Sequence, residues 1–117
     1  MIGSDPRIGV QVFVVGREKL VGYLLDLQHP TGASKAAFFL GRGFSRERPD
    51  DLAHALRKHG RNGELIGLRM RSDGQYIAIA GGVLTPLNRV IHIRTVWALR
   101  PIAPGVATFV TAYPGER

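Results

Sequence analysis

The half of the chain that follows Gly63 carries the pattern that most limits the possible folds. Four runs rich in apolar and β-branched residues follow one another, and a turn signal separates each run from the next. The runs cover residues 64–71, 75–84, 89–100 and 106–114, and their connections read "SDG", "TPLN" and "PIAPG". Short connections of this composition join neighbouring antiparallel strands. We therefore predict a meander of about four antiparallel strands.

The first half of the chain favours helices. Leucines recur at helical spacing over residues 20–27, together with Tyr23. The proline after His29 ends this pattern, because a residue that precedes proline avoids the helical region. A second helix is expected over residues 33–40, where glycines follow the last apolar residue.

A third helix has the clearest signals. Pro49 suits a first helical turn, Asp50 and Asp51 complement the positive end of the helix dipole, and Gly60 supplies the stop. A short β-type run over residues 10–15 precedes all three helices. This order predicts an α+β domain in which about three N-terminal helices pack on one face of a C-terminal four-stranded antiparallel sheet.

The length of 117 residues suits one domain with a modest core. We expect a single domain over residues 1–117, with its core in residues 10–114 and frayed termini. No apolar run approaches the roughly 18 residues that cross a bilayer, and the first residues lack the features of a secretory signal. Cysteine is absent, which excludes disulfides, thiol catalysis and Cys-ligated zinc. A cytoplasmic location is expected, and a domain cut from a larger exported protein has the same features.

The charge balance indicates a class of partner. Sixteen Lys and Arg against nine Asp and Glu give a net charge of +7. Such an excess favours polyanions, because each phosphate that Lys or Arg neutralises releases condensed counterions. Arginine dominates the basic residues, and its guanidinium can donate two parallel hydrogen bonds to a phosphate. The alternative is a soluble surface that is cationic without a polyanionic partner. No membrane partner is expected.

Alternation divides the third predicted strand into two faces. One face is apolar and should cover the helices; its residues are Ile91, Ile93, Thr95, Trp97 and Leu99. The other face contains His92, Arg94, Val96 and Arg100. Arg94 is a cation on the open face of a central strand, where it can bind a phosphate. A solvated surface arginine is the alternative.

In the last strand, the alternation alone does not decide which face meets the core. Phe109, Thr111 and Tyr113 share one face by parity. If that face is the open one, Thr111 can hydrogen-bond a phosphate oxygen and Tyr113 can stack a base or donate its hydroxyl. The alternative is that both residues were selected for strand propensity.

His29 is the best acid–base candidate among the four histidines. It lies in a loop between two helices, with Lys35 six residues further on, and histidine can take a proton from a hydroxyl or return one to a leaving group. A lone loop histidine is more often structural. His92 is a second candidate, whereas His54 and His59 are expected on the surface of the third helix. The histidines lack metal-ligand spacing, and no P-loop or Rossmann fingerprint occurs, so neither a metal nor a cofactor is expected.

Several motifs in one order resemble a small bacterial domain family of unknown function. They are "KLVGYLL", "HPTGASKAAFFLGRGF", "RTVW" and "FVTAYP", and they extend from about residue 17 to residue 114. That family is similar in turn to the barnase–EndoU–colicin–RelE group of metal-independent RNase toxins, which also place helices before a four-stranded antiparallel sheet. The resemblance implies a toxin with an antitoxin or immunity partner. It also implies a site drawn from His29, Lys35, Arg94, Thr95, Thr111 and Tyr113.

The leading hypothesis is therefore a ribonuclease toxin. His29 would assist removal of the ribose 2′-OH proton, Lys35 and Arg94 would hold the scissile phosphate, Thr111 would orient a phosphate oxygen, and Tyr113 would position or stack a base. Further substrate contacts are expected from Thr95, His92 and Arg100. The expected partners are RNA and a small acidic antitoxin or immunity protein.

Two alternatives remain open. The first is a non-catalytic module that binds nucleic acid or an acidic protein with the same basic face. The second is a toxin that cleaves NAD or transfers ADP-ribose. It ranks lower because no glutamate lies in a suitable context for catalysis.

Overall fold

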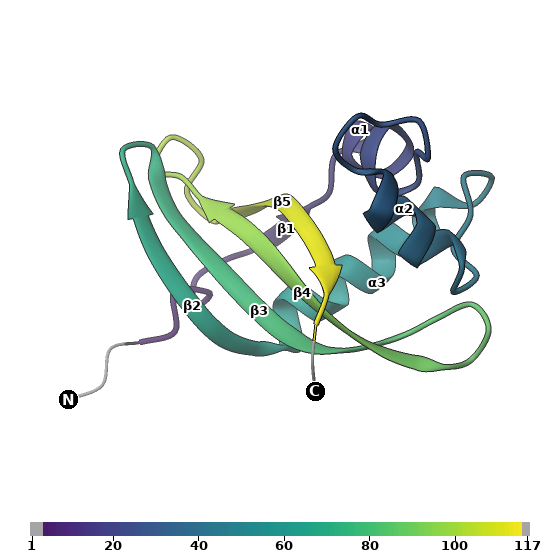
Figure 1. Ribbon diagram of the computed structural model, residues 1–117. Helices are drawn as coiled ribbons and strands as arrows, with labels where there is room; N and C mark the ends of the chain where they lie inside the picture. The colour runs from purple at the N-terminus through teal and green to yellow at the C-terminus, as the bar shows by residue number, and fades with distance from the viewer. Residues whose placement is uncertain (1–3, 116–117) are drawn as a thin grey trace.

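The predicted strands form in the predicted order in the computed structural model, which describes residues 4–115 (Figure 1). β2 (Glu64–Arg71), β3 (Gly74–Leu84), β4 (Val90–Leu99) and β5 (Val106–Pro114) each pair antiparallel with the next. The N-terminal run forms β1 (Val12–Val14), which lies parallel to β5. The order of strands in the sheet is β1-β5-β4-β3-β2. The predicted α+β class, with helices before a mainly antiparallel sheet, is confirmed.

The first helix differs from its prediction. A short α1 (Arg17–Lys19) continues directly into the π-helix η1 (Leu20–Leu24), where the N–H of Leu25 donates to the carbonyl of Leu20 at 2.8 Å. Residues five apart align in a π-turn, and Leu20 and Leu25 are both buried. The π-turn thus sends into the core two leucines that an ordinary α-helix would place on different faces. Within residues 4–115, no helix is long and apolar enough to span a membrane.

The other two helices follow the sequence closely. α2 (Ala33–Leu40) has the predicted bounds, and α3 (Pro49–Asn62) begins at the predicted proline. The predicted stop at Gly60 is wrong, because α3 continues for two further residues. A Cβ atom at Gly60 would lie 2.6 Å from the ring of Trp97. This glycine therefore lets α3 lie directly on the indole, which is a packing role that periodicity does not reveal.

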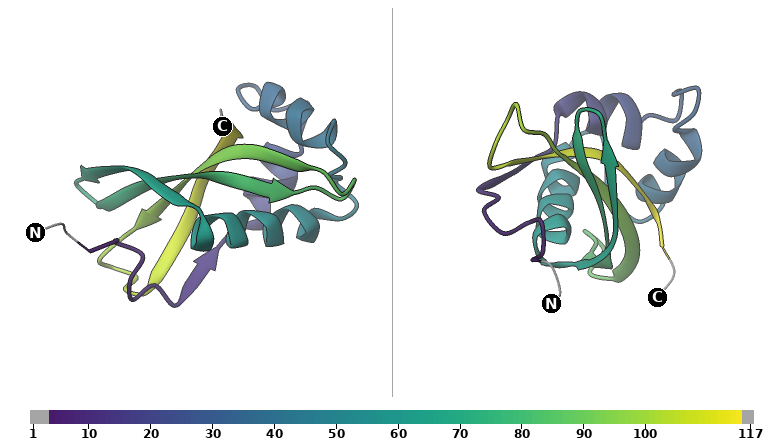
Figure 2. Two further views of the ribbon diagram at one scale, coloured as in Figure 1. Left: turned by 90° about the horizontal axis from the view of Figure 1, so that it is seen from below. Right: turned by 90° about the vertical axis from the view of Figure 1, so that its left-hand side faces the viewer.

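The core lies between α3 and the sheet. Figure 2 shows α3 running along one face of the sheet, where it contacts β3 and β4. Trp97 is fully buried there, with the rings of Phe13 and Phe109 edge-on to it at centroid distances of 5.1 and 5.4 Å. Each large side chain of this kind contributes roughly 1.5–3 kcal/mol when it leaves water. The predicted role of Trp97 on the core-facing side of β4 agrees with this packing.

His59 is buried in this core, contrary to the expectation that it lies on the surface of the third helix. It is 3% exposed; its Nε2 lies 3.0 Å from the carbonyl oxygen of Ile93 and its Nδ1 lies 2.9 Å from Thr95 Oγ1. A carbonyl can only accept, so Nε2 carries the proton and Thr95 donates to Nδ1. The indole N–H of Trp97 donates to the same Thr95 oxygen at 2.8 Å. We call His59, Thr95 and Trp97 the core network.

A β-bulge decides which residues of β5 face the core. Val96 pairs with Thr111 while the next residue, Trp97, pairs with Phe109, so Val110 has no partner on β4. The extra residue reverses the alternation within β5. Phe109 is consequently buried beside Trp97, whereas Thr111 lies on the opposite face although both positions are odd. Tyr113 follows Thr111 on that opposite face, which we call the open face.

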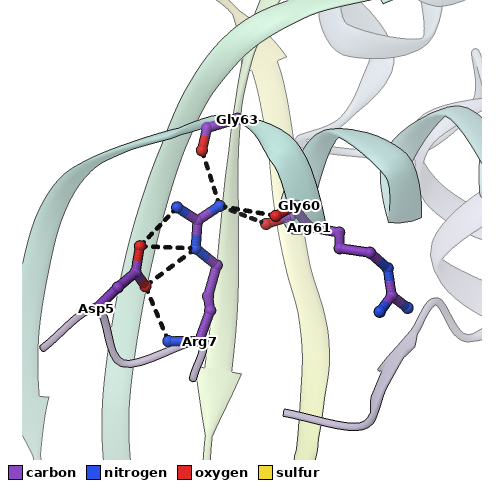
Figure 3. A network of polar contacts seen from close by, with 5 residues as sticks. All are labelled: Asp5, Arg7, Gly60, Arg61 and Gly63. Atoms are coloured by element: carbon purple, nitrogen blue, oxygen red, sulfur yellow. Dashed lines mark hydrogen bonds and ion pairs between the residues drawn. The ribbon is translucent and has the colours of Figure 1, made fainter. Parts of the chain in front are cut away.

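The chain ahead of the predicted core is also held in place (Figure 3). Arg7 Nη1 donates to the carbonyl oxygens of Gly60 at 2.9 Å and Gly63 at 2.8 Å, and Asp5 binds Arg7 Nη2 at 2.8 Å. The hydrogen bond and charge of Arg7 hold the pKa of the Asp5 carboxyl below its usual value. The guanidinium satisfies carbonyls at the C-terminal end of α3, which lack helical partners. Of the termini predicted to be frayed, residues 1–9 and 115–117, residues 1–3 and 116–117 lie outside the described residues.

Candidate functional site

The site is located where β1 ends. β1 pairs only with residues 106–108 of β5. α1 and α2 also contact β5, and they take the place that a longer β1 would occupy. At the bulge, Lys19 Nζ donates to the carbonyl oxygen of Val110 at 3.0 Å. The bulge therefore does two things: it turns Thr111 to the open face and it offers a backbone acceptor to a lysine of α1.

The centre of the site is the hydroxyl of Tyr23. Lys35 Nζ donates to this oxygen at 2.8 Å, and Thr111 Oγ1 lies 3.0 Å from it. The ammonium groups of Lys19 and Lys35 lie 5.6 and 5.4 Å from the centre of the same ring. We call Lys19, Tyr23, Lys35 and Thr111 the Tyr23 cluster. Its members come from α1, η1, α2 and β5, so the fold alone assembles it.

The surroundings of Tyr23 make its hydroxyl more acidic. Burial raises the pKa of the phenol, but the hydrogen bonds from Lys35 and Thr111 and the charges of Lys35 and Lys19 lower it, and the net result is a pKa below the usual value. The direction follows from geometry, because two cations stabilise the phenolate. A tyrosine in such surroundings can take a proton from a nearby hydroxyl and hand it on.

His29 lies beside the cluster but has a structural task. Its Nδ1 accepts the backbone N–H of Gly32 at 2.9 Å and that of Thr31 at 3.1 Å. These bonds satisfy donors at the start of α2, which otherwise lacks a side-chain cap. Both partners donate, so the proton of neutral His29 is on Nε2. The ring is edge-on to Tyr23 at 5.0 Å, and the imidazole offers an N–H donor rather than a base.

Arg94 and Tyr113 extend the site across the open face. They pair directly in the β4–β5 register, and Thr111 lies one diagonal away, opposite Val96. Diagonal neighbours on one face of a sheet are about 7–8 Å apart. Arg94 Nε is buried and has no hydrogen-bond partner among residues 4–115. A buried donor without a partner is costly, so an acceptor from a ligand would be favoured there.

A hollow on the open face extends from Thr111 and Tyr113 to the far end of the sheet. Its volume is about 730 Å³, and it is lined by residues of β2, β3, β4 and β5 that include Thr111, Tyr113, Arg69, Arg71 and Tyr76. A second hollow, of about 620 Å³, lies between α3 and β3 and contains none of the predicted site residues. The open face is therefore the surface on which two predicted residues, Thr111 and Tyr113, line a cavity large enough for a ligand.

The structure brings together some predicted residues and separates others. His29, Lys35 and Thr111 meet around Tyr23, and Arg94 and Tyr113 lie next to them on the open face. Thr95 is fully buried, and its hydroxyl is engaged with His59 and Trp97, so it does not reach a substrate.

The two remaining candidates lie outside the cluster. His92 is on the open face of β4 opposite Gly82, two residues beyond Arg94. Arg100 follows the other end of β4, where its Nε lies 3.1 Å from Asp73 Oδ2. Each is therefore displaced along β4 from the Tyr23 cluster, in opposite directions.

Sequence reasoning missed Tyr23 and Lys19. Tyr23 fits the apolar stripe of the first helix, and that fit hides the hydroxyl at the end of its ring. The available signal was the lysine four residues before it, because residues three or four apart share a helical face. The partners Lys35 and Thr111 are distant in sequence, and only the tertiary fold joins them to Tyr23. Within the described part of the chain, no group of three or more His, Cys, Asp or Glu side chains is placed to hold a metal ion.

Comparisons with known proteins add a family and a fold. A family described as a domain of unknown function (DUF6883) matches residues 8–116. The chain belongs to this family. No curated protein is significantly similar to this DUF6883 chain.

Among solved structures, the DUF6883 chain is similar to a chain of the "Contact-dependent growth inhibition toxin - immunity protein complex from Klebsiella pneumoniae 342". The TM-score is 0.64 at 14% sequence identity, and the match covers 94% of this chain and 99% of that one. At this identity the likeness shows a shared fold over nearly the whole of both chains.

Proposed function

We propose that this DUF6883 domain is a metal-independent endoribonuclease that acts as a toxin and is neutralised by an immunity protein. The observation that carries the proposal is the Tyr23 cluster, in which two lysines and a threonine surround a phenol of lowered pKa, and of which Thr111 lines the open-face hollow. The +7 charge favours RNA as the polyanion. The shared fold with a chain of a growth-inhibition toxin–immunity complex supports the toxin class.

The proposed chemistry begins at the ribose 2′-OH. The Tyr23 phenolate, stabilised by Lys35, takes the 2′-OH proton, and the 2′-oxygen attacks the adjacent phosphorus. The bond from phosphorus to the 5′-oxygen breaks, and the leaving oxygen takes a proton from the Lys35 ammonium, which regains one from the Tyr23 phenol through their hydrogen bond. The products are a 2′,3′-cyclic phosphate and a 5′-hydroxyl. No metal is needed, because the 2′-OH supplies the nucleophile and cationic side chains balance the charge of the transition state.

The remaining open-face residues hold the substrate. Lys35 and Arg94 bind the scissile phosphate, and the free Nε–H of Arg94 supplies one donor. Thr111 donates to a phosphate oxygen when its link to Tyr23 opens, and Tyr113 stacks a base. This arrangement changes the role first expected for His29. Because Nδ1 accepts two backbone N–H groups, neutral His29 donates a hydrogen bond from Nε2 to a phosphate oxygen, while Lys35 supplies the proton and Tyr23 takes the role of base.

The experiment measures RNA cleavage by purified protein in the presence of a metal chelator. The products are analysed for 2′,3′-cyclic phosphate ends. Wild-type protein is expected to cleave single-stranded RNA, and Lys35→Ala is expected to lose most of that activity. Lys58→Ala removes an exposed lysine from α3, away from the open face, and serves as the matched control. Intact RNA after incubation with folded wild-type protein would overturn the proposal.

A non-catalytic RNA-binding module is the second candidate, because the capping role of His29 explains that residue without catalysis. It predicts that wild-type protein binds RNA and leaves it intact, and that Tyr23→Phe binds equally well. The same cleavage assay, run beside a binding assay, separates the two functions.

The proposed immunity partner is acidic and covers the open face. Its carboxylates would pair with cations such as Lys35 and Arg94, and it would thereby exclude RNA. Binding of the two proteins is expected to weaken with salt, because surface charge pairs are screened.

A further inference from the structure

The far end of the open-face hollow holds a second group of aromatic and cationic side chains. Tyr76 of β3 lies there, with the guanidinium carbons of Arg71 and Arg100 at 5.1 and 5.7 Å from its ring centre. Arg100 Nη2 donates to the Tyr76 hydroxyl at 3.0 Å, and that hydroxyl donates to Asp73 Oδ2 at 2.8 Å. The Tyr76 ring is therefore held in one orientation by groups on two loops.

This region carries an excess of positive charge. Arg69, Arg71 and Arg100 contribute three guanidinium groups, and Asp73 contributes the one carboxylate that the structure places among them. Of these three arginines, Arg100 is the one that forms an ion pair with that carboxylate within residues 4–115. Among residues 4–115, Arg69 and Arg71 form no ion pair, and both line the hollow. The two arginines are consequently available to an anion.

The hollow connects this region to the Tyr23 cluster. Tyr76 pairs with Ala98 of β4, and Thr108 of β5 pairs with the same residue, so Tyr76 lies two strands away from β5. Two strand spacings amount to about 10 Å. Thr111 and Tyr113 line the same hollow as Tyr76. A flexible polymer with its phosphate at the Tyr23 cluster can therefore continue across the sheet to Tyr76.

We propose that Tyr76, with Arg69 and Arg71, forms a subsite that stacks an unpaired base of single-stranded RNA and binds its phosphate, one or more nucleotides away from the scissile bond. The inference rests on the proposed function and specifies the substrate as single-stranded. Aromatic rings beside arginines bind unpaired bases without strong sequence preference. Duplex RNA does not expose base faces in this way, so it is a poor ligand for the subsite.

The test measures binding without cleavage. A fluorescent single-stranded RNA with 2′-O-methyl riboses cannot undergo attack by its 2′-oxygen, so wild-type protein can be titrated with it directly. Tyr76→Ala is expected to weaken the affinity about tenfold, which lies within the range for loss of one stacked base. Tyr76→Phe keeps the ring and is expected to stay within about twofold of wild type.

A second variant keeps the test valid if Tyr76→Ala is unstable. Arg71 is exposed, so Arg71→Gln should fold normally. It is expected to reduce the slope of log affinity against log salt by about 0.7, the value for one phosphate contact on a single strand. Arg48→Gln, at the residue before α3, removes an exposed charge that is ion-paired with Asp51 and should leave the slope unchanged.

The outcomes separate this inference from the proposed function. If wild-type protein cleaves RNA while Tyr76→Ala and Arg71→Gln bind the probe as wild type does, the subsite is overturned and the nuclease stands. If wild-type protein neither cleaves RNA nor binds the probe, both are overturned. Equal affinity of wild-type protein for duplex and single-stranded probes would also contradict a stacking subsite.

Discussion

Each face of the sheet has a ring side chain hydrogen-bonded to a threonine, and the two rings are perturbed in opposite ways. On the core face, the His59 ring is hydrogen-bonded to Thr95, and on the open face the Tyr23 ring is hydrogen-bonded to Thr111. Burial keeps His59 neutral and lowers its pKa, despite its hydrogen bond to Ile93. Two lysines beside Tyr23 favour the charged form of the phenol instead.

The core network contributes to stability, whereas the open face keeps polar groups that can bind a ligand. In the core network every polar atom has a protein partner, so its hydrogen bonds support stability and nothing remains to bind a ligand. The open face gathers cations around one hydroxyl and leaves Arg94 Nε without a partner. Like charges held together cost stability, and such a cost is typical of a site kept for function.

The largest expected effect comes from Tyr23→Phe. This change removes only the hydroxyl at the centre of the cluster, so the proposed nuclease activity should fall by roughly 10²- to 10³-fold, as for loss of a general base or a charge-stabilising donor. The unfolding midpoint in urea should stay close to that of wild type. A fully active variant would show that the Tyr23 hydroxyl takes no part in the reaction.

Thr95→Val should show the opposite behaviour. It leaves Trp97 Nε1 without an acceptor and His59 Nδ1 without a donor inside the core. The free energy of unfolding is expected to fall by about 1–3 kcal/mol, the cost of unsatisfied buried groups. RNA cleavage by the folded variant, measured at low temperature, should match that of wild type. A strong loss of activity with unchanged stability would place Thr95 in the site after all.

Stability should also depend on pH through His59. Burial holds its pKa in the folded protein below the ordinary histidine value of about 6.5, which approximates the unfolded chain. Below about pH 6.5 the unfolded state therefore binds a proton that the native state does not. Stability should be highest above that pH and should decline as pH falls toward the folded pKa.

Urea unfolding at several pH values between about 5 and 8 measures this decline. In His59→Gln this position cannot titrate. The stability of that variant should therefore depend less on pH than the stability of wild type does. A wild-type profile that stays level through this range would indicate that His59 accepts a proton without disturbing the core.

The smallest expected effect is that of Arg7→Met, which removes the bonds to the carbonyls of Gly60 and Gly63. Because the helix end gains access to water in compensation, the free energy of unfolding should fall by only about 1 kcal/mol. Thermal unfolding measures the change. Activity should not change, since Arg7 lies at the C-terminal end of α3 and contacts none of the cluster. A larger loss would mean that residues 5–7 support the core itself.

Much of the fold was readable from local pattern. The bounds of α2, β2 and β5 follow directly from periodicity and from the glycines and prolines that flank them, because these signals act over a few residues. The π-turn at Leu20–Leu24 and the course of α3 past Gly60 were not readable in this way. Each depends on what the segment packs against, namely the core leucines and the Trp97 ring.

The candidate site, like the fold, was predictable from the sequence only in part. Sequence alone determined which residue types were present, which of them stood on strands and helices, and that the excess charge was positive. Tertiary structure decided that Thr111 turns to the open face, that Thr95 does not, and that Tyr23 is the hydroxyl on which Lys35 and Thr111 converge. The physical reason is that alternation is a local rule, whereas one bulge at Val110 reverses it, and a hydrogen bond between η1 and β5 exists only once the chain has folded.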